Sequence, residues 1–538
     1  GPLLQWLSSP TGGLSLAPAL VAIVLALVTR RVELALAFGV LIGGVVAAGG
    51  APIDAITRVA KYVGGAIGWS DGAFSVDHVE ISAFSLLVAA TVGVMGASGG
   101  TRAVIRQVER LAKGRRGAMV SAWLGGMVVF FDDYANCLVV GNAMGPLADR
   151  YGVSRQKLAY IVDSTAAPIA SLAIVSTWVG YEVGLIADQL PAGGPNAFSV
   201  FLASVPYRFY SILTLVFVGA IALSNRDFGP MWHAEAAARP HAAEEDADDG
   251  ASPWLAAVPV GLLVAGTLGW LVVRGWASLD PAKVAGVSAS LAGAEGFAGR
   301  VNGASAVLGA ANPYHAMLFG SLLALTTAVA GALAARRLEA GAVPRIAWDG
   351  ARQVADALLV LYLAWALSNA MGDTGASKAL TGLIDGTLPA WSLPGSTFVL
   401  AAATAFATGT SFGTMGILIP IALPVALQLA PGDLHILYGT TAAVLAGSCL
   451  GDHPSPISDP TILSAVGSGT SLVEHVRTQA PYALSAGVLA LVCGYLPVGL
   501  GVSVWACLAV GSVATVALVL VVGRPVPPVD AQRVERTK

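Results

Sequence analysis

Long apolar segments constrain this chain more than any other feature of its sequence. Leu14 to Thr29, Trp254 to Val273 and Pro497 to Val522 contain no charged residue. Each is close to the roughly 20 residues that an α-helix needs to cross about 30 Å of hydrocarbon. Only 11% of the 538 residues are charged, whereas a soluble domain has roughly 25%. We therefore predict an integral membrane protein without a nucleic-acid partner.

The arrangement of the apolar segments predicts an all-α, polytopic fold. They lack strand alternation, which excludes an outer-membrane barrel. Basic loops such as Arg30-Arg31, Arg336-Arg337 and Arg345 belong on the cytoplasmic side. They share one side only if two segments, 116–149 and 392–430, fold back as re-entrant hairpins. The predicted crossings number about eleven, at 14–30, 32–49, 80–100, 156–186, 207–224, 254–274, 313–335, 350–372, 433–466, 479–498 and 502–522.

Internal similarity divides the chain into two units. Met95-Gly96 pairs with Met371-Gly372, and Pro146 pairs with Pro424, at nearly equal offsets. Because the two hairpins open from opposite sides, we expect an inverted repeat with discontinuous helices. The predicted parts are N-terminal scaffold helices (1–79), a first repeat (80–232) with a broken helix at 156–186, an acidic cytoplasmic linker (233–252), connecting scaffold helices with an external loop (253–349, the loop at 277–312), a second repeat (350–478) with a broken helix at 433–466, and C-terminal helices with a cytoplasmic tail (479–538).

The tip of the first predicted hairpin carries polar residues at membrane depth. Asp132, Asp133 and Asn136 stand between two apolar runs. Each intramembrane carboxylate costs about 2.5–3.5 kcal/mol on insertion scales, so a cation or a proton must compensate it. Carboxylate and amide oxygens are the hard ligands that a sodium ion accepts. The alternative is a loop at the membrane surface, in which Asp and Asn are helix caps.

The next predicted span contains Asp163, Ser164, Thr165 and Pro168. Proline removes a backbone donor and frees nearby carbonyls, while Ser and Thr supply hydroxyls. We therefore predict a break at 163–168 with Asp163, Ser164 and Thr165 as further cation ligands. The alternative is a proline kink with both hydroxyls bonded back to the helix.

The second half carries hydroxyls at its hairpin tip and a proline-rich break after it. Three prolines between Gly451 and Pro460 prevent a regular helix. A histidine in this run would titrate near neutral pH, although a structural histidine or an ordinary exposed loop is the alternative. Asp373 is either a site member or a helix-terminus residue. The candidate residues for substrate binding and proton coupling are Thr410, Ser411, Thr414, Asp452, His453, Ser455, Ser458, Asp459 and Asp373.

Five strings, FFDDYAN, SRQKLAYIVDSTAAPIA, GTSFGTMG, GDHPSPISDPTILS and HVRTQAPYAL, resemble the NhaC-type sodium/proton antiporters of the ion transporter superfamily. The resemblance covers about residues 80–490. It implies scaffold and transport domains, elevator-type movement, a homodimer and the inner or plasma membrane of a prokaryote. It implies ion-site roles for Asp132, Asp133, Asn136, Asp163, Ser164, Thr165, Asp452 and Asp459.

Two transport functions agree with these observations. In the first, sodium and protons compete for the same carboxylates, so sodium is the transported ion and not a fixed cofactor. In the second, sodium or protons drive a small organic acid or amino acid, which is held by Thr410, Ser411, Thr414 and Ser455. A passive channel fits the paired halves less well. An enzyme is not expected, because no HExxH or Walker motif is present.

Overall fold

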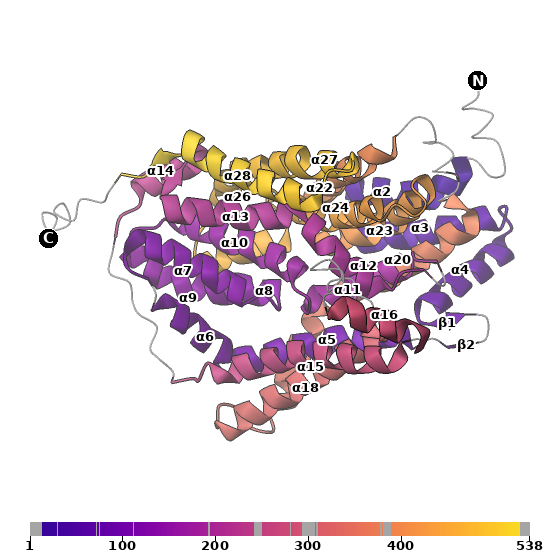
Figure 1. Ribbon diagram of the computed structural model, residues 1–538, viewed down its shortest axis with the longest axis horizontal. Helices are drawn as coiled ribbons and strands as arrows, with labels where there is room; N and C mark the ends of the chain where they lie inside the picture. The colour runs from indigo at the N-terminus through magenta and orange to yellow at the C-terminus, as the bar shows by residue number, and fades with distance from the viewer. Residues whose placement is uncertain are drawn as a thin grey trace, which may run out of the picture.

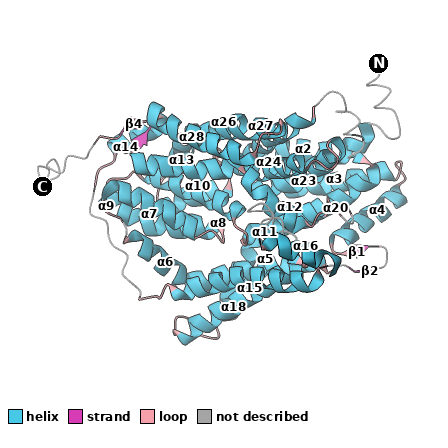
Figure 2. Cartoon of the chain, in the orientation of Figure 1, coloured by secondary structure: helices cyan, strands magenta, loops and turns pink. Residues whose placement is uncertain are grey.

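The computed structural model describes residues 13–527 except 30, 71–72, 75, 111, 192–193, 241–249, 280, 293–306, 308–309, 377–378 and 380–388. Helices make up most of this part of the chain, as Figure 2 shows. Within it, nine helices are long and apolar enough to cross a membrane, or up to eleven if each of two bent pairs counts as one span. The predicted all-α, polytopic fold is confirmed.

The N-terminal helices form one end of the molecule (Figure 1). Helix α3 lies against α20, where a Cβ at Gly43 would come within 2.7 Å of the Cβ of Ala370. Small residues allow such close contacts between membrane helices. The elements here are η1 (Gly13–Leu16), α2 (Ala17–Thr29), α3 (Val32–Ala47), α4 (Pro52–Ala66) and the antiparallel strands β1 (Trp69–Ser70) and β2 (Ala73–Phe74). From there α5 (Asp77–Ala97) and α6 (Gly100–Glu109) lead toward the opposite end of the molecule.

The first hairpin consists of α7 (Gly114–Val128), α8 (Asp133–Ala135), the π-helical turn η2 (Asn136–Val140) and α9 (Gly141–Arg150). The chain reverses between α7 and α8, and α7 and α9 lie side by side in Figure 1. The tip of this hairpin therefore lies at residues 129–132, directly before Asp133.

The broken helix that follows is interrupted later than the sequence predicts. Helices α10 (Arg155–Leu172) and α11 (Thr177–Ala187) bend by 49° at their junction, whereas a break at 163–168 was expected. That prediction is wrong because α10 continues through Pro168, and Ser171 Oγ donates to the Pro168 carbonyl at 3.0 Å. The carbonyl that loses its backbone donor to Pro168 is that of Ser164, four residues earlier, and membrane helices tolerate such a proline without breaking.

Side chains satisfy the backbone at the actual break. Ser176 Oγ donates to Ala170 O at 2.8 Å and accepts from Trp178 N at 3.2 Å, so it caps α11. Arg208 donates to Ser171 O. The break therefore lies where polar side chains are available for the ends of both helices.

The predicted linker at 233–252 begins later than expected. Helix α14 extends over its first residues, and Glu235 in it is 1% exposed. Glu235 pairs with Arg115 and accepts from Ser154 N at 2.8 Å, which explains why this segment is ordered. Residues 241–249 of the predicted linker lie outside the described residues. The elements here are α12 (Ala197–Ser204), η3 (Val205–Tyr207), α13 (Phe209–Ser224), β3 (Arg226–Asp227) and α14 (Gly229–Ala237).

Two of the connecting helices, α15 (Trp254–Ser278) and α18 (Pro313–Ala334), lie below the hairpins in Figure 1. A helix, α16, occupies part of the predicted external loop at 277–312, so the prediction of a loop throughout is wrong; residues 293–306 are outside the described part. The elements are α15 (Trp254–Ser278), α16 (Pro281–Leu291), α18 (Pro313–Ala334), α19 (Val343–Ala351), η4 (Arg352–Val354) and α20 (Ala355–Thr374).

The second hairpin turns at Gly409, whose φ of +72° favours glycine. After it, the chain breaks between Asp452 and Asp459, where the prolines predict a break. The elements are η5 (Ala390–Ser392), α22 (Leu393–Thr408), α23 (Ser411–Leu429), α24 (Leu434–Asp452), α25 (Asp459–Ser468), α26 (Leu472–Leu489), the π-helical η6 (Ala490–Tyr495), α27 (Leu496–Gly499), α28 (Val504–Val522) and β4 (Arg524–Pro525), which pairs antiparallel with β3.

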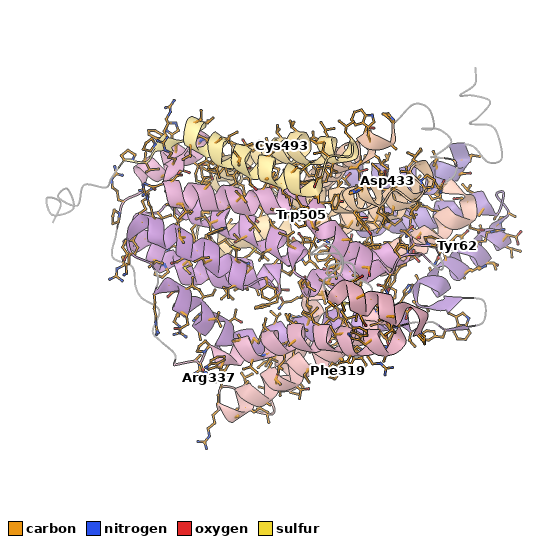
Figure 3. The ribbon with its side chains drawn as sticks, in the orientation of Figure 1. Tyr62, Phe319, Arg337, Asp433, Cys493 and Trp505 are labelled. Carbon is orange, nitrogen blue, oxygen red and sulfur yellow. The ribbon has the colours of Figure 1, made fainter. Side chains whose placement is uncertain are left out.

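Large apolar side chains cover much of the outer surface. Trp505 on α28 is 67% exposed, and Phe319 on α18 is 38% exposed (Figure 3). Extended apolar surfaces of this kind are rare on soluble proteins. They are the surfaces that a lipid bilayer covers.

Candidate functional site

A cavity of about 430 Å³ lies between the tips of the two hairpins. Its lining includes Asp132 to Tyr134 of the first hairpin and Thr408 to Thr410 of the second. Helices α3, α11, α20 and α25 supply other parts of its wall. None of its described lining residues is basic. Five carboxylates line it: Glu33, Asp132, Asp133, Asp356 and Asp459.

The first hairpin tip supplies the innermost carboxylates. Asp132 is 6% exposed and caps α8, because its Oδ1 accepts from Ala135 N at 2.7 Å. Asp133 is 2% exposed, and its Oδ2 has no hydrogen-bond partner. The tip is tied to α11 by Thr177 N, which donates to Phe131 O at 3.0 Å. A buried carboxylate oxygen therefore lines the cavity without a donor.

Two neutral oxygens near this tip are also without partners. Asn136 Nδ2 donates to Gly126 O at 2.6 Å and to Val129 O at 3.2 Å, which leaves the fully buried Oδ1 unpaired. The buried Thr177 Oγ1 is unpaired and belongs to the cavity lining. Buried polar atoms normally have a partner, so such atoms indicate an ion or water site.

The second hairpin tip is fixed by Asp452 at the end of α24. Ser411 donates to Asp452 Oδ2 from its backbone N at 3.1 Å and from Oγ at 2.5 Å. Thr410 Oγ1 accepts from Gly413 N at 3.3 Å and caps α23. Thr414 Oγ1 and Asp452 Oδ1 are buried without a partner. This tip therefore presents hydroxyls, with its one carboxylate behind it.

Asp163 does not line the cavity. It is fully buried in α10 and contacts two side chains of α26. Gln479 Nε2 donates to its Oδ2 at 2.5 Å, and His475 Nε2 lies 3.2 Å from the same oxygen. The carboxylate is therefore a tertiary contact between α10 and α26.

Helix α25 links Asp163 to both hairpins. Thr461 Oγ1 lies 3.0 Å from Asp163 Oδ2 and 3.1 Å from Asp452 O. Ser464 Oγ lies 3.3 Å from Asp163 Oδ1 and 3.1 Å from the sulfur of Cys137 in the first hairpin. A continuous chain of polar contacts thus connects the first hairpin, α10, α25 and the residue that fixes the second tip.

His453 begins the break after α24 and is fully buried. Its Nδ1 lies 2.6 Å from Tyr210 Oη, and its backbone O accepts from Gln479 Nε2 at 2.8 Å. Ser455 Oγ donates to Phe406 O at 2.9 Å. Both side chains contact protein atoms around the break and do not line the cavity.

The other predicted ligands have different surroundings. Thr165 Oγ1 donates back to Ile161 O at 2.8 Å and to Val162 O at 3.0 Å, as in the kink alternative. Ser164 is buried in the same helix. Ser458 Oγ at the start of α25 is buried without a partner. None of these three residues is in the cavity lining described above.

Asp373 lies at the other end of α20 from Asp356, about 25 Å away along the helix axis. It accepts from Arg58 Nη1 and from Tyr62 Oη, both at 2.5 Å. Tyr62 is at one end of the molecule in Figure 3. Asp373 is thus not brought to the acidic cavity, but to a second cavity of about 530 Å³, which is also lined by Asp188.

An aromatic cluster joins α11 and α23, two helices that extend from the acidic cavity toward the second one. The Phe412 ring is 5.1 Å from Trp178 and 4.9 Å from Tyr181, and Tyr181 Oη donates to Phe412 O. Helix α11 runs from Thr177 at the acidic cavity to Asp188 at the second one. The cluster lies on the helices that join the two cavities.

Buried basic residues near the site are paired. Arg208 and Glu182 are both fully buried, with 3.0 Å between Nη1 and Oε2. Lys157 pairs with Asp227, which also accepts from Tyr482 Oη at 2.6 Å. Neither pair involves a carboxylate of the acidic cavity.

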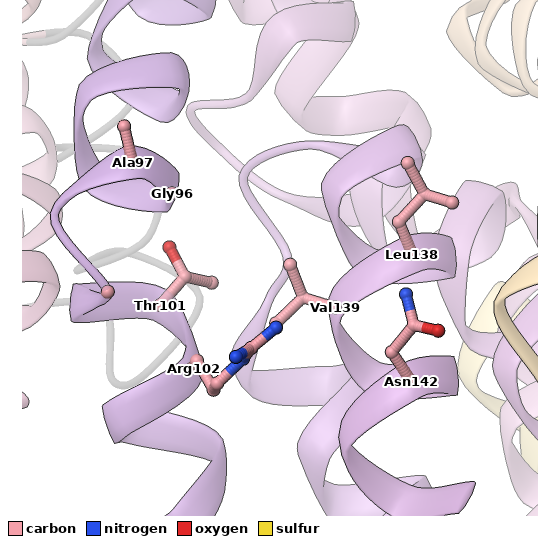
Figure 4. A pocket seen from close by; sticks show the side chains of 8 residues that line it. Gly96, Ala97, Thr101, Arg102, Leu138, Val139 and Asn142 are labelled. Carbon is pink, nitrogen blue, oxygen red and sulfur yellow. The ribbon is translucent and has the colours of Figure 1, made fainter. Parts of the chain in front are cut away.

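A further cavity of about 280 Å³ lies beside the first hairpin (Figure 4). Arg102 of α6 reaches toward Val139 and Asn142 of the hairpin. This cavity has no lining residue in common with the acidic cavity.

Several polar residues of the site were not singled out from the sequence. His475 and Gln479 are four residues apart, and Thr461 and Ser464 are three apart, so each pair shares a helix face. This spacing of polar residues within apolar helices is the sequence feature that could have identified them. Glu33 and Asp356 give no local signal, because each stands at the start of a helix, where an acidic residue is common.

Comparison with known proteins gives a consistent assignment. Residues 169–500 match the Na+/H+ antiporter family. An uncharacterized protein of Haemophilus influenzae is 32% identical over 515 residues, which cover 94% of this chain and 95% of that protein.

Two solved transporters share the fold. The YdaH transporter of Alcanivorax borkumensis, described as having an unusual topology, has a TM-score of 0.56 at 16% identity, over 84% of this chain and 90% of its own. MtrF of Neisseria gonorrhoeae, described with a class of antimetabolite efflux pumps, has a TM-score of 0.51 at 14% identity, over 90% of this chain and 88% of its own.

Proposed function

The chain belongs to the Na+/H+ antiporter family, and we propose that it exchanges sodium ions for protons through the acidic cavity between its hairpin tips. It is a multi-pass membrane transporter and not an enzyme. The observation that carries the proposal is the pair of buried carboxylates, Asp132 and Asp133, in a cavity with no basic lining residue among those described.

Exchange follows from the cost of burying these charges. An uncompensated carboxylate at membrane depth costs about 2.5–3.5 kcal/mol. Either a proton or a sodium ion removes that cost, and each makes the other unnecessary. Asp133 Oδ2 and Thr177 Oγ1 supply oxygens at the cavity, and Asn136 Oδ1 is a further unpaired oxygen behind the tip. Sodium binding therefore expels protons, and protonation expels sodium.

Asp163 has a different role in this proposal. Both of its oxygens already accept hydrogen bonds, from Thr461, Ser464 and Gln479 among others. It therefore holds the elements around the site together, so that a change of charge at the tip of the first hairpin is transmitted to α25 and to the second hairpin. Ser164 and Thr165 support its helix and do not bind the ion.

Alternating access is the proposed route. Helices α11, α20 and α23 each reach both cavities, and the Trp178, Tyr181 and Phe412 rings separate the two. The acidic cavity adjoins the starts of α3 and α20, which directly follow Arg31 and the turn that begins at Arg352, and basic segments favour the cytoplasm. We therefore interpret this conformation as open to the cytoplasm. Movement of the hairpins and broken helices as one elevator unit, related by an inverted repeat, would expose the site to the second cavity.

Vesicle flux with simultaneous readout of sodium and pH tests the proposal. We expect an imposed sodium gradient to drive protons in the opposite direction without any organic solute, and Asp133→Asn to abolish this exchange. Asp54→Asn is the matched control, because Asp54 is an exposed residue in the first turn of α4 and does not line the cavity. A wild-type protein that moves neither ion would contradict the proposal.

A coupled organic solute is the second candidate. The cavity, at about 430 Å³, lies in the range of about 300–1,000 Å³ typical of small-molecule sites. Thr410 lines it, and the Ser411 and Thr414 hydroxyls lie nearby on α23. Calorimetry with a panel of metabolites, with and without sodium, distinguishes the candidates. Heat from sodium alone supports the first, whereas heat that requires a metabolite supports the second.

A further inference from the structure

The outer part of the acidic cavity has its own set of carboxylates. Glu33, Asp356 and Asp459 stand in the first turns of α3, α20 and α25. Asp356 and Asp459 are exposed and Glu33 is half-buried, whereas Asp132 and Asp133 are buried. The cavity therefore has exposed carboxylates at its mouth and buried carboxylates at its floor.

Local helix electrostatics do not account for this convergence. An acidic residue in a first turn stabilises its own helix by about 0.3–1 kcal/mol, which explains each residue separately. It does not explain why three such residues, from helices far apart in sequence, line one cavity. The floor of the same cavity contains Asp133 Oδ2 and Thr177 Oγ1, both buried and without a partner. These atoms independently indicate a ligand at the inner end.

We propose that Glu33, Asp356 and Asp459 form a mouth that concentrates monovalent cations at the cavity and excludes organic anions from it. A cleft lined by charges of one sign raises the local concentration of the opposite ion. An organic acid in its anionic form would meet five carboxylates and no basic lining residue among those described. The inference rests on the proposed function and specifies its substrate class.

The size of the effect follows from the dimensions of the cavity. A volume of about 430 Å³ places the mouth roughly 10 Å from the floor. Removing two charges at roughly 10 Å in water lowers the cation concentration at the floor by about three-fold at 0.01 M ionic strength. At about 1 M the Debye length is roughly 3 Å, so the effect disappears.

The test uses the full-length protein in vesicles, with sodium added on the side where the cavity opens. The variants are Glu33→Gln with Asp356→Asn together, and Asp54→Asn as the first-turn control. At an ionic strength of about 0.01 M, set with choline chloride, we expect the double variant to raise the KM for sodium about three-fold with an unchanged maximal rate. At about 1 M its KM should equal that of the wild type. Lactate should not compete with sodium.

The outcomes separate the inference from the proposed function. A wild-type protein without exchange refutes the proposed function. If the wild type exchanges, equal KM values for the wild type and the double variant at low ionic strength refute the proposal that the mouth concentrates cations. They leave the proposed function unaffected. A lower maximal rate at unchanged KM would also overturn it, because these carboxylates would then act in translocation. Competition by lactate would refute the exclusion of anions.

Discussion

Replacing Asp163 by asparagine perturbs the contact that links the two hairpins. The side chains have nearly the same shape, so an asparagine oxygen can accept from Thr461 and Gln479 in place of Oδ2. Its amide nitrogen would face Ser464 Oγ, which can accept as well as donate. The hydrogen bonds therefore persist, and only the charge is lost.

The magnitude follows from the number of bonds. A hydrogen bond to a charged group contributes about 1.5–3 kcal/mol, against about 1 kcal/mol for a neutral one. Over the donors at Asp163, we expect a loss of roughly 2–3 kcal/mol. With about 2.1 cal/mol/K of unfolding entropy per residue, this lowers the melting temperature of a chain this long by only roughly 2–3 °C. If the same free energy is lost from the coupling between the two hairpins, the coupling equilibrium constant changes by roughly 30- to 150-fold.

Two measurements on one preparation check this reasoning. Thermal unfolding in detergent should show a folded Asp163→Asn protein, and vesicle flux should show exchange reduced at least about ten-fold. Asp54→Asn is the control, because it neutralises an exposed carboxylate in the first turn of α4, and it should leave both the melting temperature and the exchange rate unchanged. An Asp163→Asn protein that exchanges at nearly the wild-type rate would refute the role assigned to this residue.

Two further perturbations test the fold and the barrier. Glu182→Gln leaves Arg208 buried without its carboxylate, which should cost about 3–5 kcal/mol of folding free energy. Thermal unfolding should show this loss, and the double variant with Glu182→Gln and Arg208→Met should recover part of it. An unchanged melting temperature in Glu182→Gln would contradict the pairing. Tyr181→Phe removes the donor to Phe412 O, a bond of about 0.5–1.5 kcal/mol. It should weaken the cytoplasm-open state and raise the KM for cytoplasmic sodium about two- to ten-fold. An unchanged KM would reject the aromatic cluster as the barrier between the two cavities.

Local features of the sequence predict much of the fold. The apolar segments determine the helices, and the three prolines between Gly451 and Pro460 determine the break between α24 and α25. Pro168 shows the limit of such reasoning. A proline need not break a membrane helix, and α10 continues past Pro168 to Leu172 although the carbonyl of Ser164 loses its backbone donor. The actual break depends in part on Arg208, which is distant in sequence.

The site shows the same division between local and tertiary information. Asp132 and Asp133 are recognisable because carboxylates between two apolar runs must be compensated. Glu33 and Asp356 join them only because α3 and α20 pack beside the hairpins. Asp163 is recognisable as a buried carboxylate, but its partner His475 lies on a helix that follows the second hairpin. Which residues surround a recognised carboxylate is therefore determined by packing between distant helices.

Proton release on sodium binding tests the central claim most directly. Sodium chloride is added to the purified protein in weakly buffered detergent solution, with choline chloride as the control for ionic strength. We predict that sodium releases on the order of one proton per chain, because ion and proton neutralise the same carboxylates. The double variant with Asp132→Asn and Asp133→Asn should release none. Sodium binding without proton release, or equal release from the double variant, would contradict the account.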